Sequence, residues 1–217
     1  VLATKGQGLI YRQLADGAFT AVTSGAYITD SADRQGLALA DFDNDGDIDY
    51  IVGNTGKNSF YRASEKYPIS IYAKDFDNNG SYDAFPTLFL PTSHTDEGLK
   101  EYPAQTRDDI VKQMIGMRSK FQNYKTFATA TKDQLLTKEQ LASAQVVRAN
   151  NLSSSYIQNK GGGKFEMTPL PIEAQFSVLN GMQVDDFDGD GNLDLLINGN
   201  DYGTEVSVGR YDALNGL

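Results

Sequence analysis

Short apolar runs alternate with turn-forming residues towards both ends of the chain. Residues 37–40, 50–52, 182–184 and 195–197 are such runs, and Asp, Asn or Gly residues bound them. Runs of three to five apolar residues that end in turn residues are typical of buried β-strands. No apolar stretch approaches the ~18 residues that a membrane-spanning helix needs.

A longer pattern repeats with the same phase. Residues 9–19 and 155–165 each contain an apolar-aromatic run, a Gly-centred turn and a second run that starts at Phe. Tyr11 and Tyr156 each lie 30 positions before the first Asp of an acidic segment (41 − 11 and 186 − 156). One such hairpin cannot bury its own apolar faces, so the repeat predicts an all-β array of stacked units.

The middle of the chain follows a helical pattern. Thr106 is a predicted helix N-cap, and apolar residues follow it at steps of four, three and four positions, as on one helix face. Thr137 opens a second short helix in the same way. The apolar members of this pattern are Ile110, Met114, Met117 and Phe121, followed by Leu141 and Ala144 in the second helix.

These patterns predict three segments of one structural domain. Residues 1–92 form β-units, residues 93–150 are a mainly helical insertion, and residues 151–217 form a further β-unit. The insertion either packs on the strands, which the apolar helix face favours, or binds a partner with its exposed side.

Three nine-residue segments share the pattern D-x-D-x-[DN]-G-x-x-D, with Phe at the second position. They are residues 41–49, 75–83 and 186–194, which we call loops 1, 2 and 3. Oxygens at positions 1, 3 and 5 converge when the backbone curls, Gly at position 6 permits the sharp turn, position 7 offers its carbonyl, and Asp at position 9 closes the shell. Many flexible oxygen ligands favour Ca²⁺ over Mg²⁺, which requires a stricter octahedron.

Two alternatives to a calcium loop are weaker. A metal-free turn also favours Asp, Asn and Gly, but three copies with the same Phe and Gly favour a metal. An EF-hand requires Glu at position 12 and flanking helices, whereas position 12 is Val52, Pro86 or Ile197 here.

The charge of the chain is concentrated in these loops. The formal net charge is −10, and eleven of the 29 acidic residues are Asp residues at positions 1, 3, 5 and 9 of the loops, so 18 acidic residues remain against 19 basic ones. Three bound Ca²⁺ ions would reduce the formal charge to about −4. Because no basic stripe exists, the sequence argues against nucleic-acid binding.

The loops, with the Gly-Asn pairs and the Tyr–Gly–Phe hairpins around them, resemble the FG-GAP/VCBS repeats that form β-propeller blades, as in integrin α-subunit head domains. More narrowly, the chain resembles bacterial surface proteins of the ASPIC/UnbV-related type. The resemblance implies a partial β-propeller with a helical insertion, about three Ca²⁺ ions, and an extracytoplasmic role in adhesion, ligand binding or scaffolding. The implied ligands, side chains or position-7 carbonyls, are Asp41, Asp43, Asp45, Asp47 and Asp49; Asp75, Asp77, Asn79, Ser81 and Asp83; and Asp186, Asp188, Asp190, Asn192 and Asp194.

Three loops are too few for a closed seven-bladed ring, and loops 1 and 2 begin only 34 residues apart (75 − 41), which is short for a four-stranded blade. We therefore expect a fragment of a longer propeller.

The predicted function is a non-catalytic binding or scaffold module that recognises a protein or glycan. The alternative is a calcium-dependent carbohydrate-active enzyme resembling a polysaccharide lyase, or a glycan-binding module. With no Cys and with His94 as the only His, few residues could act as a catalytic base. Lys, Arg, Tyr or His94 would have to serve, and the sequence does not cluster them.

Overall fold

The computed structural model describes residues 36–92, 98–204 and 208–217, together with the backbone of four short strands before them. Those four strands form two antiparallel pairs, one of which joins β3 to β4. The second pair agrees with the hairpin predicted for residues 9–19. The strands are β1 (Leu2–Thr4), β2 (Gln7–Leu9), β3 (Tyr11–Gln13) and β4 (Phe19–Ala21).

The chain divides into two compact units. Unit 1 combines Val1–Tyr61 with Asn151–Leu217, and unit 2 is Arg62–Asn150. Loop 2 and the helices share unit 2, whereas loops 1 and 3 belong to unit 1. The division predicted from the sequence, into segments 1–92, 93–150 and 151–217 of one structural domain, stays a prediction.

A four-stranded antiparallel sheet with the order β12–β11–β6–β5 is the centre of unit 1. Loop 1 joins β5 to β6, and the hairpin β11–β12 turns at Gly161–Gly163, where all three glycines have positive φ. The hairpin predicted for residues 155–165 is therefore confirmed. The strands are β5 (Leu37–Ala40), β6 (Asp49–Val52), β11 (Ser155–Asn159) and β12 (Phe165–Pro169).

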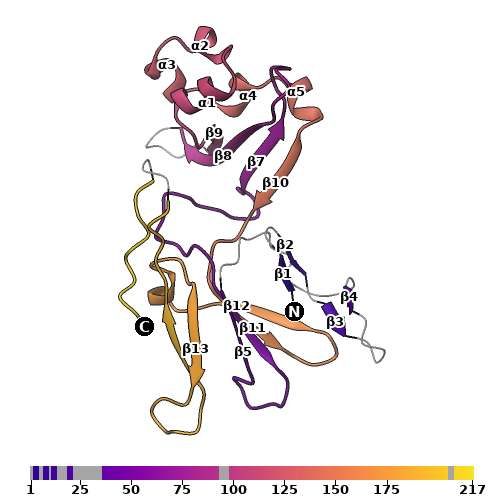
Figure 1. The fold of residues 1–217 in the computed structure, drawn as a ribbon, viewed down its shortest axis with the longest axis vertical. Helices are drawn as coiled ribbons and strands as arrows, with labels where there is room; N and C mark the ends of the chain where they lie inside the picture. Colours follow the sequence, from indigo (N-terminus) through magenta and orange to yellow (C-terminus); the bar gives the residue numbers. More distant parts are fainter. Residues whose placement is uncertain are drawn as a thin grey trace. The chain divides into compact units, whose positions relative to one another are not determined.

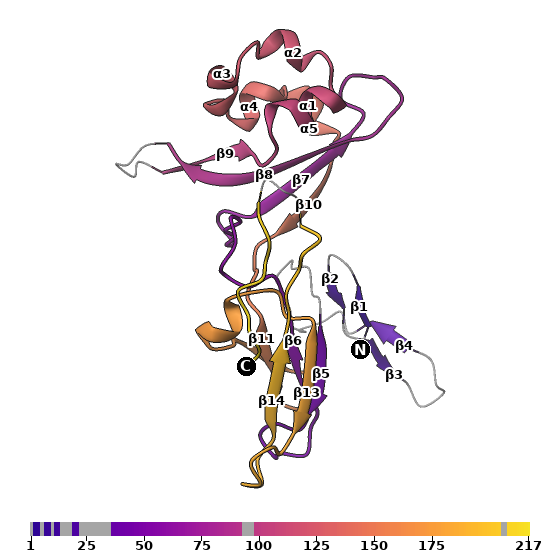
Figure 2. The ribbon, with the colours of Figure 1, turned by 60° about the vertical axis from the view of Figure 1, so that its left-hand side comes forward.

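A second hairpin of unit 1 lies beside β5 and carries loop 3. It consists of β13 (Gly181–Asp185) and β14 (Asp194–Asn198), which follow the short 3₁₀-helix η1 (Ile172–Gln175). Leu179 and Ile197 are buried in its core. Figures 1 and 2 both show loops 1 and 3 at the same end of unit 1.

Unit 2 is a four-stranded antiparallel sheet with helices on one face (Figure 1). The sheet order is β10–β7–β8–β9, and loop 2 joins β7 to β8. The strands are β7 (Ile69–Lys74), β8 (Asp83–Pro91), β9 (Leu99–Pro103) and β10 (Gln145–Ala149). The helices are α1 (Arg107–Gln113), α2 (Met117–Lys120), α3 (Tyr124–Ala128), α4 (Lys132–Leu135) and α5 (Lys138–Ala142).

The helical prediction is confirmed in its caps and its buried face, but not in its continuity. Thr106 caps α1 by accepting a hydrogen bond from the Asp109 N–H, and Thr137 caps α5 with a capping box. Met114 leaves the helical conformation at φ −122° and ψ 90°, which ends α1 before α2 begins. All four apolar residues of the predicted face are nevertheless buried in one cluster with Tyr72 and Phe85 of the sheet.

A partly buried ion pair joins α4 to the sheet. The Lys132 Nζ lies 2.6 Å from the Glu101 Oε2, and the two side chains are 15% and 13% exposed. Glu101 also accepts hydrogen bonds from the Thr87 and Tyr72 hydroxyls. Burial disfavours the charge of Lys132, but the hydrogen bond and attraction from Glu101 outweigh it, so the pKa of Lys132 is raised.

The structure confirms a mostly antiparallel β fold with few helices. It does not show a propeller, because the sheets formed by the described residues are open and each ends in edge strands. The prediction of a partial propeller with more blades in a longer chain stays a prediction.

Candidate metal centres

All three loops curl through the same two backbone positions. Position 6 is Gly with φ between 88° and 91°, as the sequence predicted from the sharp turn. Position 4 also has positive φ, at 58–77°, and holds Asn44, Asn78 or Gly189. Asn and Gly tolerate this left-handed conformation better than other residues, so position 4 is a second constraint that the sequence analysis did not include.

The carboxylate at position 1 lies inside the curl of each loop. One oxygen accepts the N–H of position 5 and the other accepts the N–H of position 6, at 2.8–3.1 Å in all three loops. These bonds restrain the carboxylates of Asp41, Asp75 and Asp186 inside the loops.

Two further hydrogen bonds recur. The side-chain oxygen of position 5 accepts the N–H of position 7, at 2.7–2.9 Å. One carboxylate oxygen of position 9 accepts the N–H of the Phe at position 2, at 2.9–3.2 Å. Because the same four bonds hold loops that share little sequence outside the pattern, the pattern itself encodes the geometry.

Each loop brings three carboxylates together, with one oxygen of each within 4.8 Å of the others. Ion-free, each pair of charges at this distance would repel by about 1–3 kcal/mol at effective dielectric constants between those of water and a protein surface. The clusters are Asp41, Asp43 and Asp45 in loop 1; Asp75, Asp77 and Asp83 in loop 2; and Asp186, Asp188 and Asp194 in loop 3.

The donor set fits a hard divalent cation. All converging atoms are carboxylate oxygens on a flexible turn, which matches the ligand chemistry of Ca²⁺. In loop 2, burial raises the pKa of the Asp83 carboxyl, and the neighbouring Asp77 and Asp75 carboxylates raise it further against the lowering effect of the Phe76 N–H. A divalent cation at this point would relieve that repulsion.

The other predicted ligands have different surroundings. At position 5, Asp45 joins its cluster, whereas Asp190 accepts hydrogen bonds from the backbone and side chain of Asn192. Asn79 accepts the N–H of Ser81. At position 7, Asp47 is exposed like Ser81 and Asn192.

Asp49, at position 9 of loop 1, lies outside the converging cluster. Its side chain is fully buried and accepts three hydrogen bonds. One oxygen accepts the Phe42 N–H at 3.2 Å and the Tyr156 hydroxyl at 2.6 Å, and the other accepts the Asn159 N–H at 2.8 Å. Burial, the bond to Asp49 and the surrounding carboxylates all raise the pKa of Tyr156.

Sequence analysis did not find Tyr156 and Asn159 as partners of loop 1. Its only signal was the fixed spacing of Tyr156 to the following loop, which marks the hairpin. Tyr156 and Asn159 instead contact loop 1, which lies more than 100 residues earlier in the chain.

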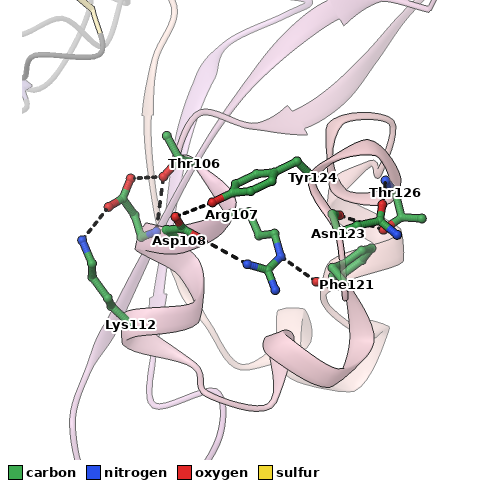
Figure 3. Close-up of polar contacts among 9 residues, drawn as sticks. Thr106, Arg107, Asp108, Lys112, Phe121, Asn123, Tyr124 and Thr126 are labelled. Atoms are coloured by element: carbon green, nitrogen blue, oxygen red, sulfur yellow. Dashed lines mark hydrogen bonds and ion pairs between the residues drawn. The ribbon is translucent and has the colours of Figure 1, made fainter.

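A hollow of about 530 Å³ in unit 2 lies between the end of β9 and helices α1 and α3. Arg107 and Tyr124 line it, and Figure 3 shows how their polar groups are used. The Arg107 guanidinium lies 5.5 Å from the centre of the Tyr124 ring and donates to the Phe121 carbonyl and to Asp108, which also accepts the Tyr124 hydroxyl. Asp108 therefore already balances the Arg107 charge.

His94, the only His, lies outside the described residues. Within the described ranges, no helix is both long and apolar enough to pass through a bilayer.

Comparison with known families gives one match. The model of the FG-GAP-like repeat matches residues 1–52, a segment that includes all of loop 1 and the strands on both sides of it. No curated protein and no solved structure matches the chain. The match supports the FG-GAP resemblance for this segment, and the narrower relation to ASPIC/UnbV-related proteins stays a prediction.

Proposed function

We propose that this chain is a calcium-stabilised, extracytoplasmic binding or scaffold module without catalytic activity. The observation that carries the proposal is the threefold recurrence of one hydrogen-bonded loop that gathers three carboxylates within 4.8 Å. The FG-GAP-like match over loop 1 supports an extracellular type of repeat.

Calcium acts as a structural ion in this proposal. Asp41, Asp43 and Asp45 would hold it in loop 1, Asp75, Asp77 and Asp83 in loop 2, and Asp186, Asp188 and Asp194 in loop 3. The ion neutralises carboxylates that otherwise repel one another, and so favours the folded loop over the unfolded chain. With Kd on the order of 10⁻⁴–10⁻³ M, as in extracellular modules, these sites suit surroundings where calcium is plentiful.

The partner in this proposal is a protein or glycan of the cell surface or matrix. The two units offer surfaces built on rigid sheets, where binding loops and insertions are commonly placed. The carbohydrate-active enzyme remains the rival function, and activity on acidic glycans that is lost on substitution of a candidate base, with the fold intact, would favour it.

Calorimetric titration of chelator-treated protein with CaCl₂, combined with thermal melts, tests the proposal. We expect about three sites, and each site is expected to add about 1.4 kcal/mol at a free calcium concentration ten times its Kd. Asp212→Asn is the control for the loss of a surface charge, because Asp212 is an exposed carboxylate of unit 1 outside the loops. This variant should bind calcium like the wild type. Absence of calcium binding would refute the proposal.

A further inference from the structure

Loop 1 differs from the other two loops because a second strand contacts it. The β11–β12 hairpin pairs with β6 and reaches the loop through Tyr156, Gln158 and Asn159. The Tyr156 ring also meets the loop residue Phe42 edge to face, with ring centres 6.0 Å apart.

The alternation of β11 explains which side chains reach the loop. Ile157 points into the core and is 2% exposed. Tyr156 and Gln158 therefore share the opposite face, where Tyr156 donates to Asp49 and Gln158 donates to the Asp43 Oδ2. The other oxygen of Asp43 accepts the Asp45 N–H, so both of its carboxylate oxygens are restrained.

Loops 2 and 3 lack this arrangement among the described residues. Asp83 and Asp194 each accept the N–H of their own Phe, and each remains in its carboxylate cluster. In loop 2 a helix residue, Gln140, contacts the backbone carbonyl of Phe76 and none of the clustered carboxylates. Among the residues that the structure describes, only loop 1 has clustered carboxylates that a strand distant in sequence restrains.

This strand closes a discontinuous unit. The chain leaves unit 1 after Tyr61, forms unit 2, and returns at Asn151. The β6–β11 pairing, with Ser155 opposite Val52, joins the two parts. The contacts from β11 to loop 1 lie at the end of this pairing that is nearer to the loop.

We propose that β11 completes the first cation site: Gln158 positions Asp43, while Tyr156 and Asn159 hold Asp49, so that calcium binding in loop 1 is coupled to the pairing of β6 with β11. This inference rests on the proposed function, since it assumes that loop 1 binds calcium. In this proposal Asp49 stabilises the contact between loop 1 and β11. Gln158, which lies outside the nine-residue pattern, positions a ligand of the metal site.

Coupling of this kind is reciprocal. If β11 orders the loop for calcium, then calcium in the loop stabilises β11 by the same free energy. Gln158 is partly exposed, so its replacement should change calcium affinity while leaving the stability of the calcium-free protein unchanged.

The test uses a background in which only loop 1 can bind. Asp77→Asn and Asp188→Asn disable loops 2 and 3, and Gln158→Leu is then added. The matched control is Gln183→Leu, the same change at an exposed residue of β13. We expect Gln158→Leu to raise the calcium Kd about tenfold by calorimetry, with an unchanged melting temperature in chelator, and Gln183→Leu to change neither.

Hydrogen exchange provides the reciprocal measurement. Calcium should slow amide exchange in peptides that cover residues 153–169 of the background variant, and this protection should disappear with Asp43→Asn.

The outcomes separate the two proposals. A Kd within twofold of the background for Gln158→Leu, an equal effect of Gln183→Leu, or unchanged exchange in β11 would each overturn the coupling while leaving the calcium module intact. Loss of all binding in the background variant, when the wild type still binds calcium, would also overturn it. No binding to the wild type would instead refute the proposed function.

Discussion

Replacing Asp49 by Asn should destabilise the protein even in the absence of calcium. The Asp49 carboxylate is fully buried and accepts three hydrogen bonds on two oxygens, from Phe42, Tyr156 and Asn159. An Asn side chain has one oxygen, so one of the two backbone N–H groups must face its amide nitrogen.

The magnitude follows from that unpaired N–H. Leaving one buried donor unsatisfied costs about 1–3 kcal/mol. If the amide turns its oxygen towards Phe42 and Tyr156, the Asn159 N–H is unpaired, and the opposite orientation leaves the Phe42 N–H unpaired. Either rotamer carries the penalty.

Asp194→Asn is the matched variant, at the same position of loop 3. Asp194 is partly exposed, and within the described ranges its side chain accepts only the Phe187 N–H, which an amide oxygen can still accept. In chelator we therefore expect no loss in its free energy of unfolding, because removing one charge relieves the repulsion from Asp186 and Asp188. A loss of stability relative to the wild type should appear only with calcium.

The assay is urea unfolding in excess chelator, followed by far-ultraviolet circular dichroism. Because the two units can unfold in separate steps, amide exchange in β6 and β11 should locate the loss in unit 1. The reasoning would be refuted if Asp49→Asn were as stable as the wild type in chelator and lost stability only in calcium, as expected for Asp194→Asn.

Three other substitutions test separate parts of the structure. Asp77→Asn should lower the melting temperature in calcium but not in chelator, since Asp77 is exposed and no hydrogen bond to its side chain is found within the described residues. Equal decreases in melting temperature in the two conditions, measured by scanning calorimetry, would count against the metal assignment. Gly191→Ala should cost about 1–2 kcal/mol with or without calcium in urea unfolding, because Gly191 has φ 89°, whereas Gly116→Ala, at φ −58°, should cost nothing. Lys132→Met should destabilise unit 2 by about 1–3 kcal/mol, because it leaves the partly buried Glu101 carboxylate without its cationic partner. Adding Glu101→Gln should recover part of that loss, and no recovery would show that the Lys132 side chain stabilises unit 2 mainly through packing.

The sequence determined whatever depends on neighbouring residues. The nine-residue loops were predictable because each of the four hydrogen bonds that recur in them joins residues no more than seven positions apart. The flanking strands followed from short apolar runs closed by turn residues. The caps at Thr106 and Thr137 were predictable because a cap acts within one helical turn.

Only the tertiary structure decided which distant elements meet. The pairing of β6 with β11 brings Tyr156 and Asn159 to Asp49 across more than 100 residues, and no local pattern specifies which strand edge a hairpin will join. The same holds for loop 2, which groups with the helices in unit 2 because β7 pairs with β10 after the insertion. Position 9 is an Asp in all three loops, yet its surroundings differ because burial and hydrogen-bond partners are properties of the assembled sheet.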